Sequence, residues 1–335
     1  MSFLDSTKNH LRTARACLRY ARAVYSTLKS TSDKREFSHS DWNAILDAHC
    51  CTNGASTDLL RPFLRRLTPA RAARDTFGLL GRFTASEQRR IAEQISRDGY
   101  YVFETLLPEV ICNRIEEFAR TSPASVFDEF GAKGEIIPYD FRSPRGRLYK
   151  FAQSALIQNS AIQQLMADDA FFRIAESYLQ TEVTIGGVDG WWSAPYGDGP
   201  SSESAQMFHF DFDAPPNWLK LFVYVTPVEE ETGPHVYVRG SHKSRNNRAR
   251  DILARGYQRI PDEDIEQVYG ARSIVEITGK RGTVFMADTR GFHKGKHPTC
   301  SDRLVAQIVY CSPVFLDPMR RHTVGVFPTE WKSQS

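Results

Sequence analysis

The sequence predicts an α+β protein in which a helical N-terminal part precedes an antiparallel sandwich or barrel of short strands. Apolar residues recur near helical spacing in residues 1–35, and short apolar runs separated by turn residues begin at Val183. With 335 residues, 41% of them hydrophobic, the chain can bury a substantial core. The small net charge of +3, without a basic stripe interleaved with aromatic residues, argues against nucleic acid as a partner.

Residues 1–35 carry eight basic and two acidic side chains and are expected to form a basic amphipathic helix. We expect this helix to dock on the rest of the chain, because Ala and Cys interrupt its apolar face. Two alternatives stay open, namely a weak contact of residues 1–30 with a membrane surface and a role as an organellar presequence.

A change of pattern near residue 84 predicts a domain boundary. Residues 36–83 look mostly helical, and a capping box at residues 84–87 then opens a new helix. The predicted helices span residues 84–97, 109–120, 157–167 and 170–179, and the predicted strands span residues 183–194, 206–212, 219–225, 235–239, 273–278, 283–287 and 303–311. The chain is therefore divided into a helical N-terminal extension, residues 1–83, and a domain of residues 84–335.

Cysteine usage and hydropathy predict a cytoplasmic protein. The six cysteines show neither CxxC spacing nor the density of a disulfide framework, which favours a reducing compartment. The sequence has no run of 18 apolar residues and no apolar core of a secretory signal.

Residues 206–213, QMFHFDFD, carry the strongest indication of a functional site. In a strand, His209 and Asp211 point to one face and the phenylalanines to the other. A nitrogen and a carboxylate oxygen two residues apart can bind one metal ion, and the pair suits Fe(II) in a site of two histidines and one carboxylate. Asp213 shares this face but lies one strand repeat further along. A second His-x-Asp triplet, at residues 39–41, lies in a polar, helix-like stretch, which indicates surface or capping chemistry.

The second histidine of such a site must come from elsewhere in the sheet. His293 is preferred because it lies 84 positions after His209 and directly follows the predicted strand 283–287. Ten residues later Arg303 opens the strand RLVAQIVY, and its planar guanidinium would hold an anion deep in the barrel beside the metal. A salt bridge with a carboxylate is the alternative for this arginine. The other histidines considered as ligands are His235, His242, His297 and His322.

Four segments occur together in an order that is more specific than any single motif. They are ISRDGYYVFETLLPEVICNRI from residue 95, HFD from residue 209, TPVEEETGPHVYVRGSHKS from residue 226 and GTVFMADTRGFHKGKHPTCSDRLVAQIVY from residue 282. Through them, roughly residues 84–315 resemble the phytanoyl-CoA dioxygenase family of Fe(II)/2-oxoglutarate-dependent oxygenases. The resemblance implies an α+β fold whose core is a double-stranded β-helix, jelly-roll and cupin-like, with flanking helices.

By this resemblance His209, Asp211 and His293 would bind iron, and Arg303 would pair with the distal carboxylate of 2-oxoglutarate. Dioxygen and 2-oxoglutarate would be co-substrates in the hydroxylation of an unactivated C–H bond, with release of succinate and CO2. The substrate would be a small molecule or an acyl- or carrier-linked group. A non-catalytic ligand-binding barrel of the same fold is the alternative.

Two departures from the family pattern concern the pocket rather than the metal. His235 stands where an aliphatic residue is usual after Gly-Pro, and Arg239 stands where Pro is frequent before Gly-Ser-His. The identity of the substrate is therefore not predicted. Gln206 and Lys150 are further candidates for binding the co-substrate, with a structural role as the alternative for each.

Overall fold

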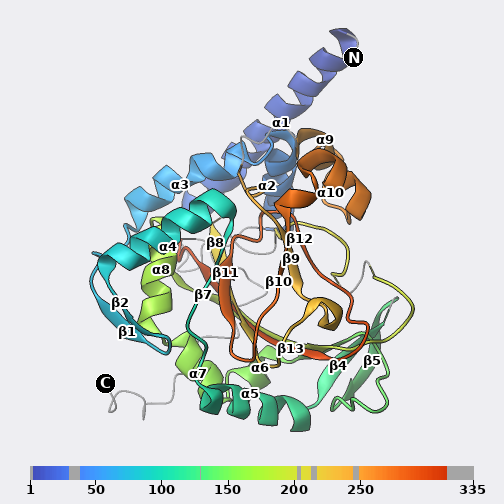
Figure 1. The fold of residues 1–335 in the computed structure, drawn as a ribbon. Helices are drawn as coiled ribbons and strands as arrows, with labels where there is room; N and C mark the ends of the chain where they lie inside the picture. The colour runs from blue at the N-terminus through green and yellow to red at the C-terminus, as the bar shows by residue number, and fades with distance from the viewer. Residues whose placement is uncertain are drawn as a thin grey trace.

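The computed structural model describes residues 3–29, 38–128, 130–201, 205–212, 217–243 and 249–314 (Figure 1). Its α-helices are α1 (Phe3–Lys29), α2 (His39–Cys51), α3 (Ala55–Leu67), α4 (Ala85–Asp98), α5 (Glu109–Thr121), α6 (Gln153–Leu156), α7 (Ser160–Met166), α8 (Asp169–Leu179), α9 (Arg250–Leu253) and α10 (Asp262–Tyr269). Its strands are β1 (Thr76–Gly78), β2 (Gly81–Phe83), β3 (Tyr100–Val102), β4 (Ala124–Asp128), β5 (Gly131–Ile137), β6 (Leu148–Phe151), β7 (Thr184–Ser193), β8 (Trp218–Tyr224), β9 (His235–Val238), β10 (Ile274–Ile277), β11 (Val284–Ala287), β12 (His293–Gly295) and β13 (Arg303–Cys311).

Two antiparallel sheets face each other and enclose the interior of the protein. The larger sheet has eight strands in the order β3-β11-β8-β13-β7-β6-β4-β5, and the smaller has three in the order β10-β9-β12. Phe222, Tyr224 and Phe285 of the larger sheet share one buried apolar cluster with Tyr237 and Ile277 of the smaller sheet. This arrangement confirms the predicted α+β class with a double-stranded β-helix at its core.

Strand β13 shows how side-chain alternation gives the larger sheet two different faces. Leu304, Ala306 and Ile308 point outward into an apolar cluster that includes residues of α4, α5, α7 and α8. Arg303 and Gln307 point inward and line a cavity between the sheets. Every residue of β13 is buried, because helices cover one face of the sheet and the second sheet covers the other.

The N-terminal helices pack behind the segment 205–212, which carries the first two predicted metal ligands. The phenylalanines of this segment are buried in a cluster with residues of α1, α2, α3, α9 and α10. Phe212 lies against Trp42 and His49 of α2, with ring centroids 5.6 and 4.8 Å apart. The aromatic face that alternation predicts is therefore covered by the helical extension.

Helix α1 docks on α2 and α3 along one side only. Ala23 is buried there, and the Tyr20 hydroxyl donates to the backbone oxygen of Ser56 at 2.9 Å. On the other side, Leu18 is 72% exposed and Tyr25 is 62% exposed. Figure 1 shows the first turns of α1 projecting beyond the rest of the protein.

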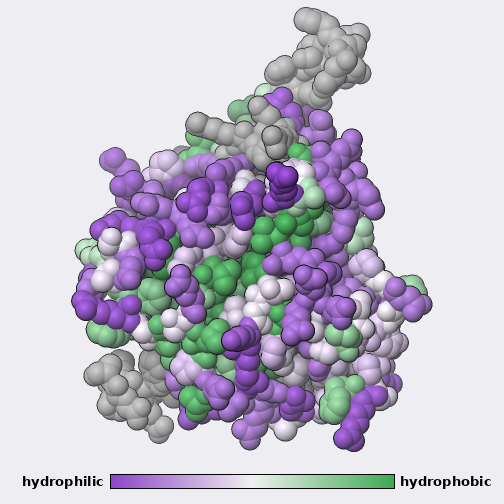
Figure 2. All heavy atoms as spheres, viewed as in Figure 1, coloured by the Kyte–Doolittle hydropathy of each residue, from purple (hydrophilic) through white to green (hydrophobic). Residues whose placement is uncertain are grey.

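Hydrophilic side chains cover the outward side of α3 and of the α9–α10 segment (Figure 2). Apolar side chains of these helices, such as Leu60 and Leu64 of α3, are turned toward the segment 205–212, although Leu59 of α3 stays 77% exposed. Within the part of the chain that the structure describes, no helix is both long and apolar enough to cross a membrane.

The structure differs from the predicted secondary structure in several places, and it contains strands, β3 to β6 and β12, that the sequence did not predict. Residues 206–212 form no regular strand; isolated bridges join Phe208 to Ile260 and His209 to His293. The alternation of side chains is kept without a regular strand, because the phenylalanines are buried against the helices on one side of the segment.

Residues 76–83, predicted to be helical, form the β1–β2 hairpin, which Gly81 allows with a φ of +101°. Strand β12 has only three residues, too few for an alternating pattern to reveal.

Candidate active site

Three predicted ligand residues meet at one point between the two sheets. Nε2 of His209 lies 3.7 Å from one carboxylate oxygen of Asp211, and Nε2 of His293 lies 3.4 Å from the other. The two histidines exchange backbone N–H···O bonds of 2.9 and 2.8 Å. One ligand atom from each of the three residues falls within 4.8 Å of the others. Two nitrogens and one oxygen at this spacing can hold a ferrous ion.

Backbone carbonyls hold both imidazoles in the tautomer that a metal needs. Nδ1 of His209 lies 2.9 Å from the backbone oxygen of Met207, and Nδ1 of His293 lies 2.9 Å from that of Gly291. A ring nitrogen that faces a carbonyl carries the proton, so each Nε2 keeps its lone pair for a metal. Burial, and then the neighbouring His293, lowers the pKa of His209 to about 3, which keeps the ring neutral.

Lys220 is a site residue that sequence reasoning missed. Its ammonium lies 2.6 Å from Oδ2 of Asp211, and its side chain is 5% exposed. Burial alone would raise the pKa of the Asp211 carboxyl, but Lys220 and then His293 hold that pKa well below its ordinary value. The available signal was a lone lysine in WLKLFVY, a strand in which every residue is buried. A buried lysine needs an anionic partner, and here that partner is a candidate metal ligand.

Arg303 lies buried in the same cavity, and its guanidinium is only partly satisfied. Its Nη1 donates to the backbone oxygen of Gly233, and its Nη2 lies 3.2 Å from Oγ of Ser193. The Nε atom has no hydrogen-bond partner, and no carboxylate of the described residues pairs with this arginine. Burial lowers the pKa of the guanidinium below its ordinary value, and Tyr224 offsets this effect only in part. The arrangement leaves Arg303 able to bind an external anion.

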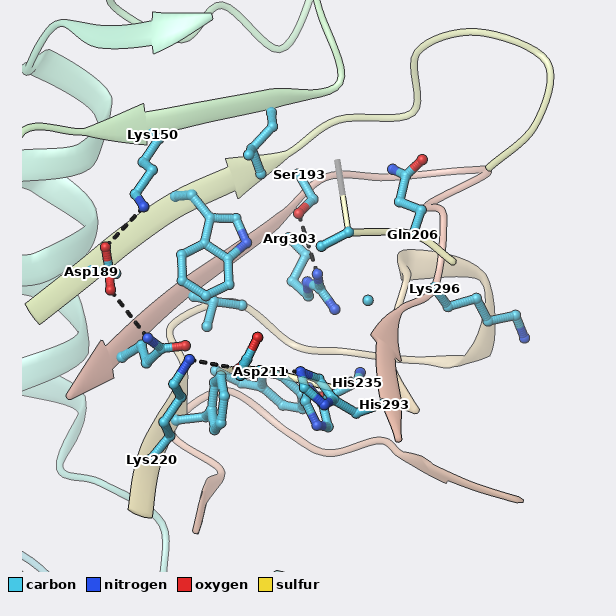
Figure 3. A pocket seen from close by; sticks show the side chains of 18 of the residues that line it. Lys150, Asp189, Ser193, Gln206, Asp211, Lys220, His235, His293, Lys296 and Arg303 are labelled. Atoms are coloured by element: carbon cyan, nitrogen blue, oxygen red, sulfur yellow. Dashed lines mark hydrogen bonds and ion pairs between the residues drawn. The ribbon is translucent and has the colours of Figure 1, made fainter. Parts of the chain in front are cut away.

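A cavity of about 250 Å³ connects the triad with Arg303 (Figure 3). Gln206 and Lys150 also line it. Oε1 of Gln206 accepts a bond of 2.8 Å from the backbone of Ser201. Lys150, whose side chain is 47% exposed, pairs with Asp189 at 3.0 Å. Because both have partners within the protein, a contact of either with the co-substrate stays a prediction.

The other candidate histidines lie outside the cluster of three. His235 lines the cavity, with its ring centroid 5.2 Å from that of His293, but it is not among the clustered ligand atoms. His242 and His297 each bond a backbone oxygen through Nε2, at 3.2 and 3.3 Å. His297 is half-buried.

The second His-x-Asp triplet, at residues 39–41, belongs to a helix cap. Ser38 and Asp41 form a capping box at the start of α2, which confirms the capping interpretation. His322 and Asp213 lie outside the described residues.

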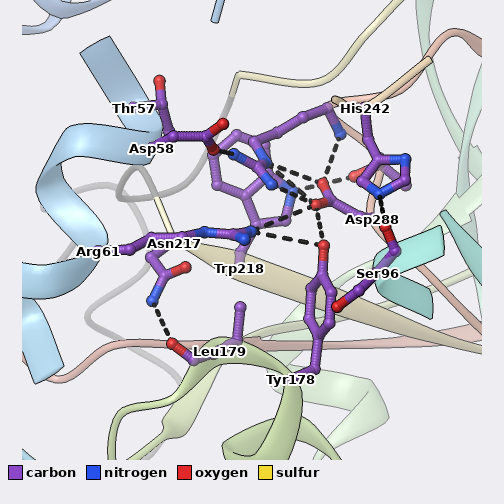
Figure 4. A network of polar contacts seen from close by, with 12 residues as sticks. Thr57, Asp58, Arg61, Ser96, Tyr178, Leu179, Asn217, Trp218, His242 and Asp288 are labelled. Carbon is purple, nitrogen blue, oxygen red and sulfur yellow. Dashed lines mark hydrogen bonds and ion pairs between the residues drawn. The ribbon is translucent and has the colours of Figure 1, made fainter. Parts of the chain in front are cut away.

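Behind the triad, a buried ion-pair network joins the helical extension to the loop that precedes His293 (Figure 4). One oxygen of Asp288 lies 2.5 Å from Nη2 of Arg290 and 2.5 Å from the hydroxyl of Tyr178. Arg290 also pairs with Asp58 of α3 at 3.1 Å. Burial opposes ionisation of Asp288, yet Arg290 holds its pKa well below the ordinary value. Helix α3 therefore helps to fix the loop that delivers a metal-ligand candidate.

Replacement Arg290→Met is expected to lower the free energy of unfolding by about 3–5 kcal/mol, because it leaves the Asp288 carboxylate buried without its main partner. Urea unfolding followed by circular dichroism measures the change. Arg255→Met is the matched control, since the Arg255–Asp264 pair is 2.7 Å long but partly exposed, and its loss should cost about 1 kcal/mol or less. Equal effects of the two replacements would contradict the importance of the buried pair.

A double-stranded β-helix that brings two histidines and an aspartate together beside a buried, partly satisfied arginine defines a class of protein, the Fe(II)/2-oxoglutarate-dependent oxygenases. The chain belongs to the phytanoyl-CoA dioxygenase (PhyH) family, whose model matches residues 95–303. The match contains the whole triad and ends on Arg303. Iron and 2-oxoglutarate are accordingly the cofactor and co-substrate of this protein's family. Among curated proteins, none matches the sequence.

Solved structures of iron and 2-oxoglutarate enzymes resemble this chain at low identity. EctD from S. alaskensis with bound Fe is 20% identical, with 75% of this chain and 92% of that chain covered and a TM-score of 0.47. The epimerase SnoN in complex with Fe3+, alpha ketoglutarate and nogalamycin RO is 15% identical, with coverages of 68% and 84% and a TM-score of 0.47. HygX from Streptomyces hygroscopicus with nickel and 2-oxoglutarate bound is 15% identical, with coverages of 68% and 89% and a TM-score of 0.44. Membership of the family rests on the sequence match.

Proposed function

We propose that this protein hydroxylates an unactivated C–H bond of a small-molecule or acyl- or carrier-linked substrate and releases succinate and CO2. The observation that carries this function is the convergence of His209, Asp211 and His293 beside the buried Arg303 in one cavity. Family membership supports the oxygenase chemistry. The cavity supports the assignment of the individual residues.

The donor set of the triad fits iron(II). Two imidazole nitrogens and one carboxylate oxygen leave coordination positions for a 2-oxo acid and for dioxygen. Asp211 would bind through one oxygen while Lys220, 2.6 Å from Oδ2, holds the other. Lys220 thereby restrains the rotation of the carboxylate and fixes the direction of its free lone pairs.

The distal carboxylate of 2-oxoglutarate fits the surroundings of Arg303. A bound carboxylate would supply the hydrogen-bond acceptor that Nε lacks. It would also supply a negative charge beside the buried, positively charged guanidinium. The contact with Ser193 holds the guanidinium in place from the side. Phe222 and Phe285 offer apolar walls for the methylene carbons of the co-substrate.

When bound, iron(II) and 2-oxoglutarate supply the oxidising power that places one atom of dioxygen in a C–H bond. The residues of the chain contribute binding, orientation and exclusion of water. His209 and His293 present unprotonated Nε2 atoms because carbonyls hold the protons on Nδ1. Arg303 fixes the far end of the co-substrate, and the buried Phe222 and Phe285 shield its methylene carbons from water.

The wall of the cavity formed by β6, β7 and β13 is where we place the substrate. Leu148 and Trp191 give this wall an apolar part. Asp189 gives it a polar part, because it bonds Gln307 at 3.1 Å and Lys150 at 3.0 Å. Such a wall suits a small molecule that carries both an apolar portion and hydrogen-bonding groups.

Purified protein supplied with Fe(II), 2-oxoglutarate and dioxygen is expected to release succinate, and faster when a metabolite extract is added. With the substrate in hand, mass spectrometry under labelled dioxygen should find one labelled oxygen atom in the product. Chlorine should not enter from chloride buffer, because Asp211 fills the coordination position that a halide needs. Succinate release no greater than that of His209→Ala, with or without extract, would favour a ligand-binding barrel instead.

Helix α1 is assigned a stabilising role rather than a membrane-binding one. Deletion of residues 1–30 should remove the contacts of Ala23 and Tyr20, and lower the unfolding temperature by roughly 2–4 °C for each kcal/mol lost. Iron affinity should not change. Thermal unfolding and iron titration of the full chain and the deletion variant measure both quantities. Flotation with anionic vesicles that the deletion abolishes would support the membrane-surface alternative.

A further inference from the structure

His235 is a buried histidine in the cavity that the triad does not use. It begins strand β9 directly after Gly233-Pro234, and it is 7% exposed. Its ring packs against Phe222 and Phe285, with centroids 5.0 and 5.3 Å apart, and lies nearly parallel to His293 at 5.2 Å. These neighbours would accept an aliphatic side chain equally well. The imidazole therefore needs a reason other than packing.

The Nε2 atom of His235 is buried and has no hydrogen-bond partner in the protein. A buried polar atom without a partner destabilises the folded state, so an atom of this kind that faces a cavity calls for an explanation, and a bound ligand is one. Coordination of the same iron does not explain it, because the clustered ligand atoms are those of His209, Asp211 and His293. His235 thus requires a polar partner within the cavity but outside the triad.

A second orphaned nitrogen, Nε of Arg303, lines the same cavity. The two residues are linked through the backbone, since Nη1 of Arg303 donates to the oxygen of Gly233, two positions before His235. The space between them is kept open by Gly295, which is the register partner of His235 in β12. A Cβ at Gly295 would come to 3.2 Å from Nη2 of Arg303. In Figure 3, His235 and Arg303 face this shared space.

We propose that Nε2 of His235 donates a second protein hydrogen bond, beside Arg303, to the distal carboxylate of 2-oxoglutarate. A carboxylate has two oxygens and about four lone-pair directions, so it can accept from both residues at once. His235 would then be a positioning residue that selects a 2-oxo acid with a distal carboxylate. This role rests on the proposed function, because it requires 2-oxoglutarate in the cavity.

The test is anaerobic calorimetric titration of the Fe(II)-loaded protein with 2-oxoglutarate and with pyruvate, a 2-oxo acid without the distal carboxylate. His235→Leu should weaken 2-oxoglutarate binding about 10- to 100-fold, the range for a hydrogen bond to a charged group. Pyruvate affinity should stay within about twofold, because the lost donor does not face it. His235→Gln, whose amide can reach a similar position, should restore most of the affinity for 2-oxoglutarate. His297→Leu is the matched control and should change neither affinity, since His297 bonds the backbone of Gly197 outside the cavity.

Unchanged 2-oxoglutarate affinity in His235→Leu would overturn this role. Equal weakening for both acids would also overturn it, because it would mean a general disturbance of the cavity or a contact with the shared 2-oxo acid end. Failure of the unmodified, iron-loaded protein to bind 2-oxoglutarate would instead overturn the proposed function, and the role of His235 with it. The three outcomes are distinguished in one set of titrations.

Discussion

His293→Ala is expected to lose stoichiometric iron and all turnover, and the same holds for His209→Ala and Asp211→Ala. Each replacement removes one of three ligand atoms that lie within 4.8 Å of one another. Loss of an outer partner of a metal ligand already costs about 10- to 100-fold in metal affinity, so loss of a ligand itself should cost more than about 100-fold. Metal analysis after anaerobic dialysis measures iron content, and succinate formation measures turnover.

His297→Ala is the control for the loss of a histidine as such. Its ring is half-buried and bonded to the backbone of Gly197, and it does not line the cavity. Full iron content and full activity are expected. His235→Ala should also keep its iron, although its affinity for 2-oxoglutarate should fall. If His293→Ala stayed active while His235→Ala or His297→Ala lost iron, the assigned ligand set would be wrong.

Arg303→Leu is expected to raise the Kd for 2-oxoglutarate by about 30-fold or more, with little effect on Fe(II) binding. Truncation of one partner in a buried, hydrogen-bonded charge pair costs about 2–5 kcal/mol, and each 1.4 kcal/mol is tenfold in affinity. Arg303→Lys should recover part of the loss, because lysine keeps the charge but not the planar fork. Anaerobic titration of the iron-loaded variants measures the constants.

Lys150→Leu is the comparison that decides which cation binds the co-substrate. Lys150 lines the cavity, but its ammonium is already paired with Asp189 and nearly half exposed. Its removal should therefore change the Kd for 2-oxoglutarate less than removal of Arg303. A large increase in this Kd for Lys150→Leu, with none for Arg303→Leu, would mean that Lys150 binds the distal carboxylate of 2-oxoglutarate. Arg303 would then have a structural role.

The proximity of His209, Asp211 and His293 could be predicted from the sequence, because the features that indicate it lie in short stretches of the chain. His209 and Asp211 are separated by one residue, and the phenylalanines between and around them fix which way they point. This alternation holds even though residues 206–212 are not a regular strand. The spacing from the strand before His293 and the position of Arg303 at the start of β13 are similarly local features.

Lys220 and the network around Asp288 could not be predicted, because their partners are chosen by tertiary packing. A lysine in an apolar strand indicates a buried charge but does not say which carboxylate it meets. The pairing of Arg290 with Asp58 depends on how α3 docks, and no periodicity encodes that. For the same reason, the sequence did not predict that the N-terminal helices pack against the segment 205–212.

The pairing of Asp58 with Arg290 also limits the order in which the protein can fold. The two residues are 232 positions apart, so the entropy of closing a very long loop opposes their contact. During synthesis α2 and α3 emerge well before the segment 205–212 and the loop that precedes His293. Apart from α1, their apolar sides have nothing to pack against until those residues follow, and such transiently exposed surfaces favour aggregation. Because the first helices of the chain cover the segment 205–212 from behind, we expect the candidate iron ligands His209 and Asp211 to reach their final places late in folding, when those helices close over them.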